Sequence, residues 1–485
     1  METKFKSGPN TAGRLDAAWV KENRECQRID ELNLLKVSIE KWLMIKTISK
    51  FYKKSAPNAH SFPDENHDNE LRRMKWSVFL SITVGYGFYY VCRLSFNVAK
   101  KSLADEGIFT VTELGLIGSA LFFAYAFGKL ANGMLADRIN VRKFMTTGLL
   151  VSAVVNILLG FTTEFWFFAI LWGVNGWFQS FGAPSSVVSI VHWFGGKERG
   201  SIWGMWGTSH NIGEAITFIF TAFIVGSFGW MWGFRAAGIS CLIICFFMWK
   251  CLYERPEVYG LPRPDDSPTP RKDISMGAKQ WQVFKSPAIW ILAFSSAFFY
   301  VTRYAVNSWG MFFLEAEKGY STLEAGSIIS VNAIAGILGT FFSGILSDKF
   351  FKGRRNVPAL IFGFIYFLSI SLFVLGPANS VIDTFSMVMF GLSLGVLIIY
   401  LGGLMAVDIA SKEASGTALG IVGVASYIAA GIQDIVSGIL IDNNMTVTNG
   451  ETIYNFEAAG YFWIGASLIS MILATFVWNA KSDNS

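Results

Sequence analysis

Tyr90-Val-Cys-Arg93-Leu-Ser-Phe-Asn97 occurs twice in this chain, the second time as Tyr300-Val-Thr-Arg303-Tyr-Ala-Val-Asn307. Both copies read Tyr-Val-x-Arg-x-x-x-Asn, and their arginines lie 210 residues apart (303 − 93) in a chain of 485 residues. Each arginine stands inside an apolar run that is long enough to cross a bilayer. Arginine in hydrocarbon costs at least ~2.5–3.5 kcal/mol, so an intramembrane arginine indicates a functional site. Two at matching positions indicate a duplicated membrane fold.

The composition excludes an ordinary soluble protein. Hydrophobic residues make up 52% of the chain and charged residues only 15%, with 44 Phe and 17 Trp, which is typical of a membrane protein. The net charge of +5 is small and spread over short loops, so we expect no nucleic-acid partner. We also expect no metal and no cofactor, because the five cysteines lack metal-ligand spacing. They are Cys26, Cys92, Cys241, Cys245 and Cys251.

Twelve apolar stretches after residue 75 are long enough to span a bilayer, which takes about 20 residues. They lie near 76–98, 112–136, 144–162, 165–191, 200–227, 230–252, 287–314, 324–347, 357–376, 382–407, 416–441 and 457–479. The longest break, 253–286, is polar and rich in proline. We therefore predict an all-α membrane protein with twelve transmembrane helices in two pseudo-symmetric six-helix halves. The predicted parts are an extension 1–74, a half 75–252, a linker 253–286 and a half 287–480.

The N-terminal extension carries charges of both signs and no predicted span. Within it, residues 32–45 have apolar positions at helical spacing with lysines nearby, which predicts an amphipathic helix. One interpretation is that this helix rests on the cytosolic membrane surface or on the protein's own loops. The other is that it binds a partner protein. Residues 55–74 have the composition of a linker.

The loops set the expected orientation. Basic residues gather in the loops on one side of the predicted spans, and the opposite loops are poorer in them, so the basic side is expected in the cytosol. Both termini are then cytosolic. The basic residues are Arg138, Arg142, Lys143, Lys197, Arg199, those of 253–286, Lys349, Lys352, Arg354 and Arg355.

A second motif repeats at nearly the same offset as the arginines. Gly133-Met-Leu-Ala-Asp137-Arg138 follows the second predicted span, and Gly344-Ile-Leu-Ser-Asp348-Lys349 follows the eighth, 211 residues later (344 − 133). Constant offsets indicate two homologous halves with a binding site between them near the membrane midplane. We interpret the glycines, carboxylates and basic residues of this motif as a conformational latch on the cytosolic face. Its members are Gly133, Asp137, Arg138, Gly344, Asp348 and Lys349.

The latch motif, repeated in a twelve-span chain, resembles the cytosolic loop signature of the major facilitator superfamily. Over about residues 75–480 a finer resemblance is to its organophosphate:phosphate antiporter family, through Arg199-Gly200-x5-Trp206-Gly207-Thr-Ser-His210-Asn211-Ile-Gly213-Glu214. Asn307-Ser-Trp309-Gly310 looks more like the hexose-phosphate members, which include transporters and a sensor. The resemblance implies the fold of that superfamily and an organophosphate substrate exchanged for inorganic phosphate.

The repeated arginines are the leading candidates for substrate binding. A planar guanidinium donates paired hydrogen bonds that fit a phosphate ester, so Arg93 and Arg303 together would clamp it between the halves. The resemblance implies the same pair. The alternative for Arg93, seven residues before Lys100, is that its side chain reaches the lipid headgroups. A matching Arg303, set more centrally, argues against that alternative.

Further candidates surround the arginines. Lys129 matches a pore lysine of the family, although it could instead reach toward the cytosol. His210 lies well inside a span, where it either exchanges a proton with substrate or bonds a neighbouring carbonyl. Tyrosines one or two helical turns before each cation share its helix face, and one more follows from the resemblance. They are Tyr86, Tyr90, Tyr125, Tyr300 and, by resemblance, Tyr427.

The chain departs from the family at charged positions. Family members usually carry Lys, Asp and Glu where this chain has Leu94, Ser308 and Ala333, which is what the joint loss of a compensating set would look like. Glu214 replaces a family glycine, and Asp434 lies in the eleventh predicted span. We regard both acids as possible coupling groups.

No nucleophile-and-base set or phosphate-binding loop is present in the sequence, so an enzyme is not expected. The leading hypothesis is a monomeric inner-membrane carrier that exchanges a sugar phosphate for inorganic phosphate by rocking its halves around Arg93 and Arg303. A ligand sensor of the same fold, signalling to a membrane partner, is the rival from another class. A carrier for a different anion, whose counter-substrate uses Glu214, is the third.

Overall fold

The computed structural model describes Trp42 and residues 46–58, 67–262, 276–351, 355–410, 414–449 and 451–478. The chain forms two compact units, Met1–Lys54 and Ser55–Ser485. In the first unit, residues 46–52 are helical. The predicted amphipathic helix 32–45 lies outside the described residues, except for Trp42.

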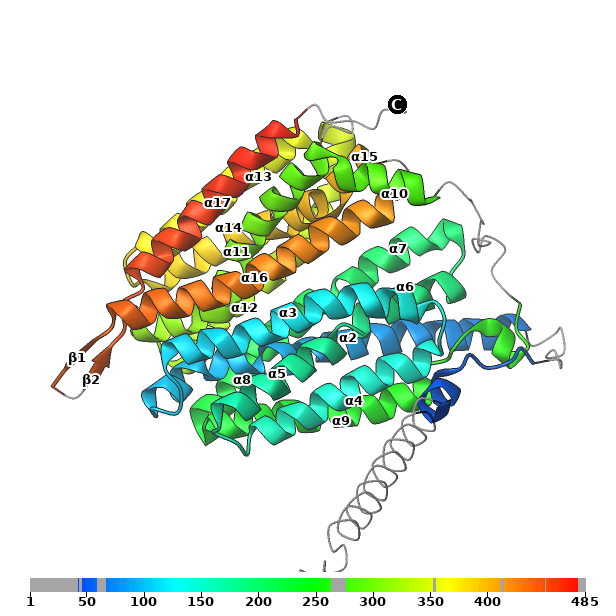
Figure 1. The fold of residues 1–485 in the computed structure, drawn as a ribbon, viewed down its shortest axis with the longest axis horizontal. Helices are drawn as coiled ribbons and strands as arrows, with labels where there is room; N and C mark the ends of the chain where they lie inside the picture. The colour runs from blue at the N-terminus through cyan, green and yellow to red at the C-terminus, as the bar shows by residue number, and fades with distance from the viewer. Residues whose placement is uncertain are drawn as a thin grey trace, which may run out of the picture. The chain divides into compact units, whose positions relative to one another are not determined.

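Six predicted spans make the first half of the second unit (Figure 1). Its helices are α2 (His67–Asp105), α3 (Val111–Ala136), α4 (Val141–Leu159), α5 (Phe165–Gln179), α6 (Gly182–Trp193), α7 (Gly196–Gly207), α8 (Ser209–Phe228) and α9 (Trp230–Cys251). The fourth predicted span is thus broken between α5 and α6, and the fifth at Thr208. Because α2 begins at His67, residues 67–74 belong to its first turns and not to a linker. A short 3₁₀ helix, Pro256–Tyr259, follows the half.

The second half repeats this arrangement. Its elements are α10 (Met276–Lys285), α11 (Pro287–Ala316), α12 (Thr322–Ile345) with a π-helical turn (Leu346–Phe350), α13 (Asn356–Leu375), α14 (Ser380–Ile399) with a second π-helical turn (Tyr400–Leu404), α15 (Met405–Ile409), α16 (Ser415–Asn444), the antiparallel strands β1 (Thr446–Thr448) and β2 (Glu451–Ile453), and α17 (Glu457–Phe476). Each interruption divides a helix without changing the order of the predicted spans.

Ten helical segments among the described residues are long and apolar enough to cross a membrane. The first and fourth predicted spans are not among these ten. Helix α2 is less apolar than the ten, because tyrosines, serines and Arg93 lie between its apolar residues. It is still long enough to span a bilayer core, since its 39 residues extend about 58 Å at 1.5 Å per residue. The fourth span is divided into α5, with 15 residues, and α6, with 12. With these two, the structure has the predicted 6 + 6 layout.

The two halves start their second spans in the same way. Thr110 caps α3, and Ser321 caps α12, each in a capping box with the glutamate three residues later. The two caps lie 211 residues apart (321 − 110), which is the offset of the latch motif. The duplication therefore includes the signals that begin individual helices.

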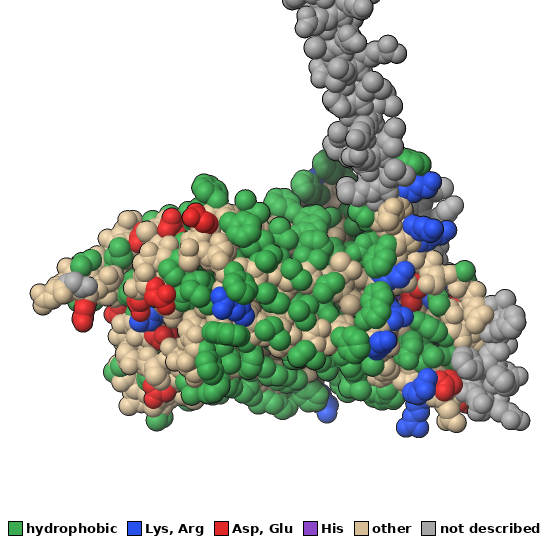
Figure 2. Space-filling view, turned by 90° about the horizontal axis from the view of Figure 1, so that it is seen from below, with side chains coloured by type: hydrophobic (Ala, Val, Ile, Leu, Met, Phe, Trp, Pro, Cys, Tyr) green, Lys and Arg blue, Asp and Glu red, His purple; other side chains and the backbone are tan. Residues whose placement is uncertain are grey.

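Charge divides the two ends of the helical unit. On the face that Figure 2 shows, hydrophobic side chains cover the middle, lysine and arginine gather toward one end, and acidic side chains gather toward the end that carries the β1–β2 hairpin. We call these the basic end, where α3 ends and α4 begins, and the hairpin end, where α2 ends and α3 begins.

The halves meet at the hairpin end and diverge toward the basic end. Helix α3 packs against α16, and α8 against α12. Near the hairpin end the fit is tight, because a Cβ on Gly115 of α3 would stand 2.5 Å from the Asp434 carbonyl oxygen of α16. Toward the basic end, a Cβ on Gly416 or Gly420 of α16 would meet no described atom within 4 Å. The halves are thus in closer contact near the hairpin end than beside these two glycines of α16.

Glycine at position 213 is required by the packing of α8 on α2. A Cβ there would lie 2.3 Å from the backbone oxygen of Gly87. We expect Gly213→Ala to lower the free energy of unfolding by about 1–3 kcal/mol, the usual cost of overpacking. The measurement is the melting temperature of the purified protein in detergent.

Gly204→Ala is the matched control, because its Cβ would meet no described atom within 4 Å. Alanine also favours a helix interior over glycine. Equal melting temperatures for the two variants would contradict the close approach of α2 and α8.

Candidate functional site

Arg93 and Arg303 lie on the inner faces of the two halves, on α2 and α11, and each side chain is about 3% exposed. The guanidinium carbon of Arg93 lies 4.2 Å from the ring centre of Tyr125 and 5.0 Å from that of Tyr90. That of Arg303 lies 5.4 Å from the ring centre of Tyr300. Neither arginine reaches toward lipid headgroups, so the alternative for Arg93 is wrong.

Tyr427 of α16 lies at the centre of an aromatic cluster that joins the two arginines. Its ring centre is 4.5 Å from that of Tyr125 and 5.6 Å from that of Tyr300. Tyr304 belongs to the same cluster, 6.0 Å from Tyr427 and with Arg303 over its ring at 5.3 Å. The sequence interpretation missed Tyr304, because it considered tyrosines one or two helical turns before a cation and not the residue beside Arg303.

Both arginines hold hydrogen-bond donors that nothing in the described part of the chain accepts. These are Nε and Nη1 of Arg93 and Nε of Arg303. The hydroxyl of Tyr304 is likewise buried without a hydrogen bond of good geometry, with the side chain of Tyr427 as its neighbour. Buried polar groups are normally paired, and an unpaired one costs about 1–3 kcal/mol, so donors left free around one centre indicate a site for an acceptor-rich anion.

Lys129 and His210 lie at the edge of the aromatic cluster. The Lys129 ammonium is 5.3 Å from the ring centre of Tyr427, so this lysine of the first half reaches a helix of the second. The His210 ring lies 5.8 Å from that of Tyr90 and bonds the Gly207 carbonyl at the break between α7 and α8. The bond to a neighbouring carbonyl is thus present, and the exchange of a proton with substrate stays a prediction. Tyr86, 5.8 Å from Tyr90, extends the cluster toward Trp206.

Glu214 brings a carboxyl group into the same centre. It lies on α8, is 3% exposed, and stands close enough to Asn307 of α11 for a side-chain hydrogen bond. Arg303 and Arg93 are its charged neighbours. An acid of the first half therefore faces the repeated motif of the second half.

Asp434 does not join this centre directly, because it forms an ion pair with Lys100. Asp434 Oδ1 accepts from Lys100 Nζ at 2.8 Å, and both side chains are fully buried. The sequence interpretation missed Lys100. Leu94, Ser308 and Ala333, where the resemblance leads us to expect charges, are buried as well, at 2%, 0% and 2% exposure.

The latch residues lie at the basic end, away from the arginines. Gly133 precedes the end of α3, Asp137 caps that helix, and the Arg138 side chain is exposed. In the second copy the helix continues into the π-helical turn Leu346–Phe350, where the Lys349 side chain is exposed. The described side chains do not include Gly344 and Asp348, and the latch remains a prediction.

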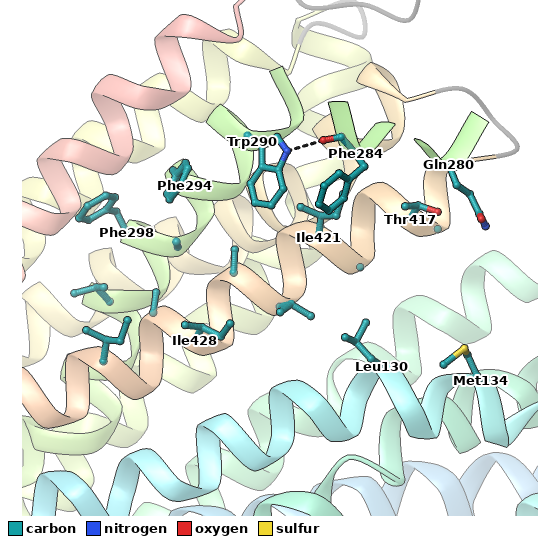
Figure 3. Close-up of a pocket in the computed structure, with 18 of the residues that line it drawn as sticks. Leu130, Met134, Gln280, Phe284, Trp290, Phe294, Phe298, Thr417, Ile421 and Ile428 are labelled. Carbon is teal, nitrogen blue, oxygen red and sulfur yellow. Dashed lines mark hydrogen bonds between the residues drawn. The ribbon is translucent and has the colours of Figure 1, made fainter. Parts of the chain in front are cut away.

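A large hollow lies elsewhere, on the flank of the protein between α3, α11 and α16 (Figure 3). Its volume is about 910 Å³, and its walls include Leu130, Met134, Phe294 and Ile421. Leu130, Met134 and Phe294 are between 46% and 66% exposed on the hydrophobic surface. None of the described residues that line the hollow is an arginine, so it is separate from the centre around Arg93 and Arg303.

The comparisons with known proteins agree with this geometry. Residues 82–433 match the model of the Major Facilitator Superfamily. The membrane sensor protein UhpC of Salmonella typhimurium is 32% identical, over 78% of this chain and 88% of its own. A probable hexose phosphate transport protein of Chlamydia trachomatis is 30% identical, over 86% and 93%. A bacterial homologue of the human lysosomal transporter Spinster, solved inward-facing and unoccupied, has the same fold with a TM-score of 0.68 at 17% identity, covering 84% of this chain and 97% of that one.

A twelve-span fold with two facing halves and an anion site between them defines a secondary-carrier architecture. The chain belongs to the major facilitator superfamily and, within it, to the organophosphate:phosphate antiporter family. It is an integral, multi-pass membrane protein.

The hydroxyl of Tyr304 can be tested separately from its ring. We expect Tyr304→Phe to fold normally and to weaken phosphate-ester binding about 2- to 12-fold, the loss of one hydrogen bond worth ~0.5–1.5 kcal/mol. Titration calorimetry on the purified protein measures this. Tyr366→Phe is the control, because the Tyr366 hydroxyl bonds the Phe299 carbonyl within the second half. Equal affinity in wild type and Tyr304→Phe would exclude the hydroxyl from the site.

Proposed function

We propose that this protein is a secondary transporter of organophosphates, of the sugar-phosphate class, that exchanges its substrate for inorganic phosphate. The observation that carries the proposal is the pair of buried guanidinium groups, one from each half, with donors that the protein leaves free. The named functions of its relatives support the same substrate class. One relative is a probable hexose phosphate transport protein, and another is a glycerol-3-phosphate transporter.

The chemistry of the site favours a phosphate monoester over a carboxylate. Two planar guanidinium groups can donate in pairs to the several oxygens of one phosphate. The six tyrosines offer hydroxyls and apolar ring faces, which suit the rest of a sugar ring. Lys129 adds a positive charge at the edge of the centre, and so attracts anions toward it.

Alternating access follows from the position of the arginines. Each half holds one arginine, so a phosphate bound to both stays in place while the halves rock around it. The tight contact of the halves at the hairpin end corresponds to the one of the two states that is closed at this end. With the basic end in the cytosol, as the positive-inside rule predicts, this state faces the cytosol and both termini are cytosolic. A bacterial inner membrane fits the relatives, which are bacterial proteins.

Replacing either arginine tests the proposal. We expect Arg93→Lys and Arg303→Lys each to reduce counterflow of labelled hexose phosphate into phosphate-loaded vesicles at least about 30-fold. Truncating one partner of a buried, charged contact costs about 2–5 kcal/mol, and lysine lacks the paired donors.

Arg73→Ala is the matched control on the same helix, because the Arg73 side chain is 66% exposed and pairs only with Glu70 among the described residues. Undiminished counterflow in both lysine variants would contradict the proposed clamp.

We propose Glu214 as the internal counter-anion of the site. When no substrate is bound, its carboxyl group can partly neutralise Arg303, and phosphate must displace it. Glu214→Gln should therefore lower the KM for phosphate ester and slow its release, so that kcat also falls, each by about fivefold or more. Counterflow kinetics measure both constants, with the exposed Glu457→Gln on α17 as control. A higher KM in Glu214→Gln would contradict this role.

A sensor of the same fold is the second candidate. The 32% identity to a membrane sensor protein and the N-terminal extension favour it. Binding of hexose phosphate to the purified protein without measurable counterflow would support the sensor. Counterflow that depends on Arg93 and Arg303 would support the carrier.

A further inference from the structure

The buried ion pair between Lys100 and Asp434 joins the two halves at the hairpin end. Lys100 belongs to α2 and Asp434 to α16, and the pair is 2.8 Å long with both side chains fully buried. The Lys100 ammonium also lies 3.8 Å from the ring centre of Trp309 on α11. The second half therefore surrounds this lysine of the first half with one countercharge and one aromatic face.

Glycine at position 118 lets Asp434 reach that position. A Cβ on Gly118 would stand 1.8 Å from Asp434 Oδ2. Ser308 and Trp309 lie beside the same carboxylate without hydrogen bonds of good geometry. The carboxylate is thus held mainly by Lys100 and by the space that Gly118 leaves.

The ion pair is connected to the arginine site. A void of about 10 Å³, near the lower limit for one water molecule, is lined by both Arg93 and Asp434, together with Asn97 and Tyr304. Arg93, Asn97 and Lys100 share one face of α2, because they are spaced by four and three residues. Lys100 therefore stands two helical turns from Arg93, about 10 Å along the same face.

Opening the hairpin end must separate this pair, since its members belong to different halves. The lysine would then be left without its countercharge in a region of low dielectric, which is unfavourable unless another anion replaces Asp434. A phosphate ester arriving from the hairpin end carries the required charge and several acceptor oxygens. The Lys100–Asp434 pair, called the lock below, therefore favours the closed state until an anion is present.

We propose that Lys100 is an outer phosphate site that Asp434 occupies as an internal anion in the closed state. Incoming phosphate takes the place of the Asp434 carboxylate and then moves along α2 to Arg93. This inference rests on the proposed transport function.

The test measures opening and transport separately. Ile441, fully buried and seven residues after Asp434 on the same face of α16, is replaced by cysteine as a reporter. Labelling by a membrane-impermeant maleimide, applied to the hairpin-end side of proteoliposomes, reports opening of that end. The parent without this cysteine gives the background, and inorganic phosphate and hexose phosphate are the added anions.

We expect anions to accelerate labelling of the reporter when the lock is intact. Gly118→Ala should displace the Asp434 carboxylate, and Asp434→Asn should remove its charge. Each variant should raise the rate of labelling measured without added anions about tenfold or more. Lys100→Gln should abolish the acceleration by anions and raise the KM for uptake from the hairpin-end side about tenfold, without changing the KM for uptake from the basic end.

Asp383→Asn is the matched control, because Asp383 and Lys318 form a buried ion pair at 2.5 Å within the second half alone. It should leave the labelling rate unchanged. Labelling and uptake that are both insensitive to Lys100→Gln and Asp434→Asn would overturn the inference while leaving the proposed transport function intact. Anion-dependent labelling without counterflow would instead support the lock and contradict the transport function.

Discussion

Two like charges buried between the halves of a membrane protein are the constraint on which the rest of the site depends. Arg93 and Arg303 cannot lose their protons at any ordinary pH, so the surroundings must make their charge tolerable. Aromatic ring faces and the carboxyl group of Glu214 do this among the described side chains. Some guanidinium N–H groups still have no acceptor among the described residues, and these can donate to an anion.

The packing of the helices holds the two arginines in place. Glycines at crossing points, such as Gly213 against α2 and Gly118 against Asp434, let helices approach closely enough to bury polar groups between them. The same glycine-mediated contacts that close the hairpin end bring Asp434 to Lys100, so the closure of one end and the electrostatics of the centre are linked.

Much of the fold and of the arginine site was predictable, because the sequence repeats its motifs at a nearly constant offset. The arginine motif, the latch motif and the 253–286 break predict two six-helix halves and a shared site, and Tyr90, Tyr125 and Tyr300 do contact the arginines or their cluster. The ion pair of Lys100 with Asp434 was not predictable, since 334 residues separate its members and only the packing of the halves brings them together. The break at Thr208 was not predictable either, because no proline lies near it. The break at Ser180-Phe181 does have a sequence signal, since Pro184 cannot donate a hydrogen bond to the Ser180 carbonyl.

The central claim is that one phosphate group is held by both halves at once. Cryo-electron microscopy of the purified protein with a hexose phosphate tests it most directly. The account predicts density for a phosphate within hydrogen-bond distance of the guanidinium groups of Arg93 and Arg303 together. Density bound to one arginine alone, or found outside the contact between the halves, would contradict it.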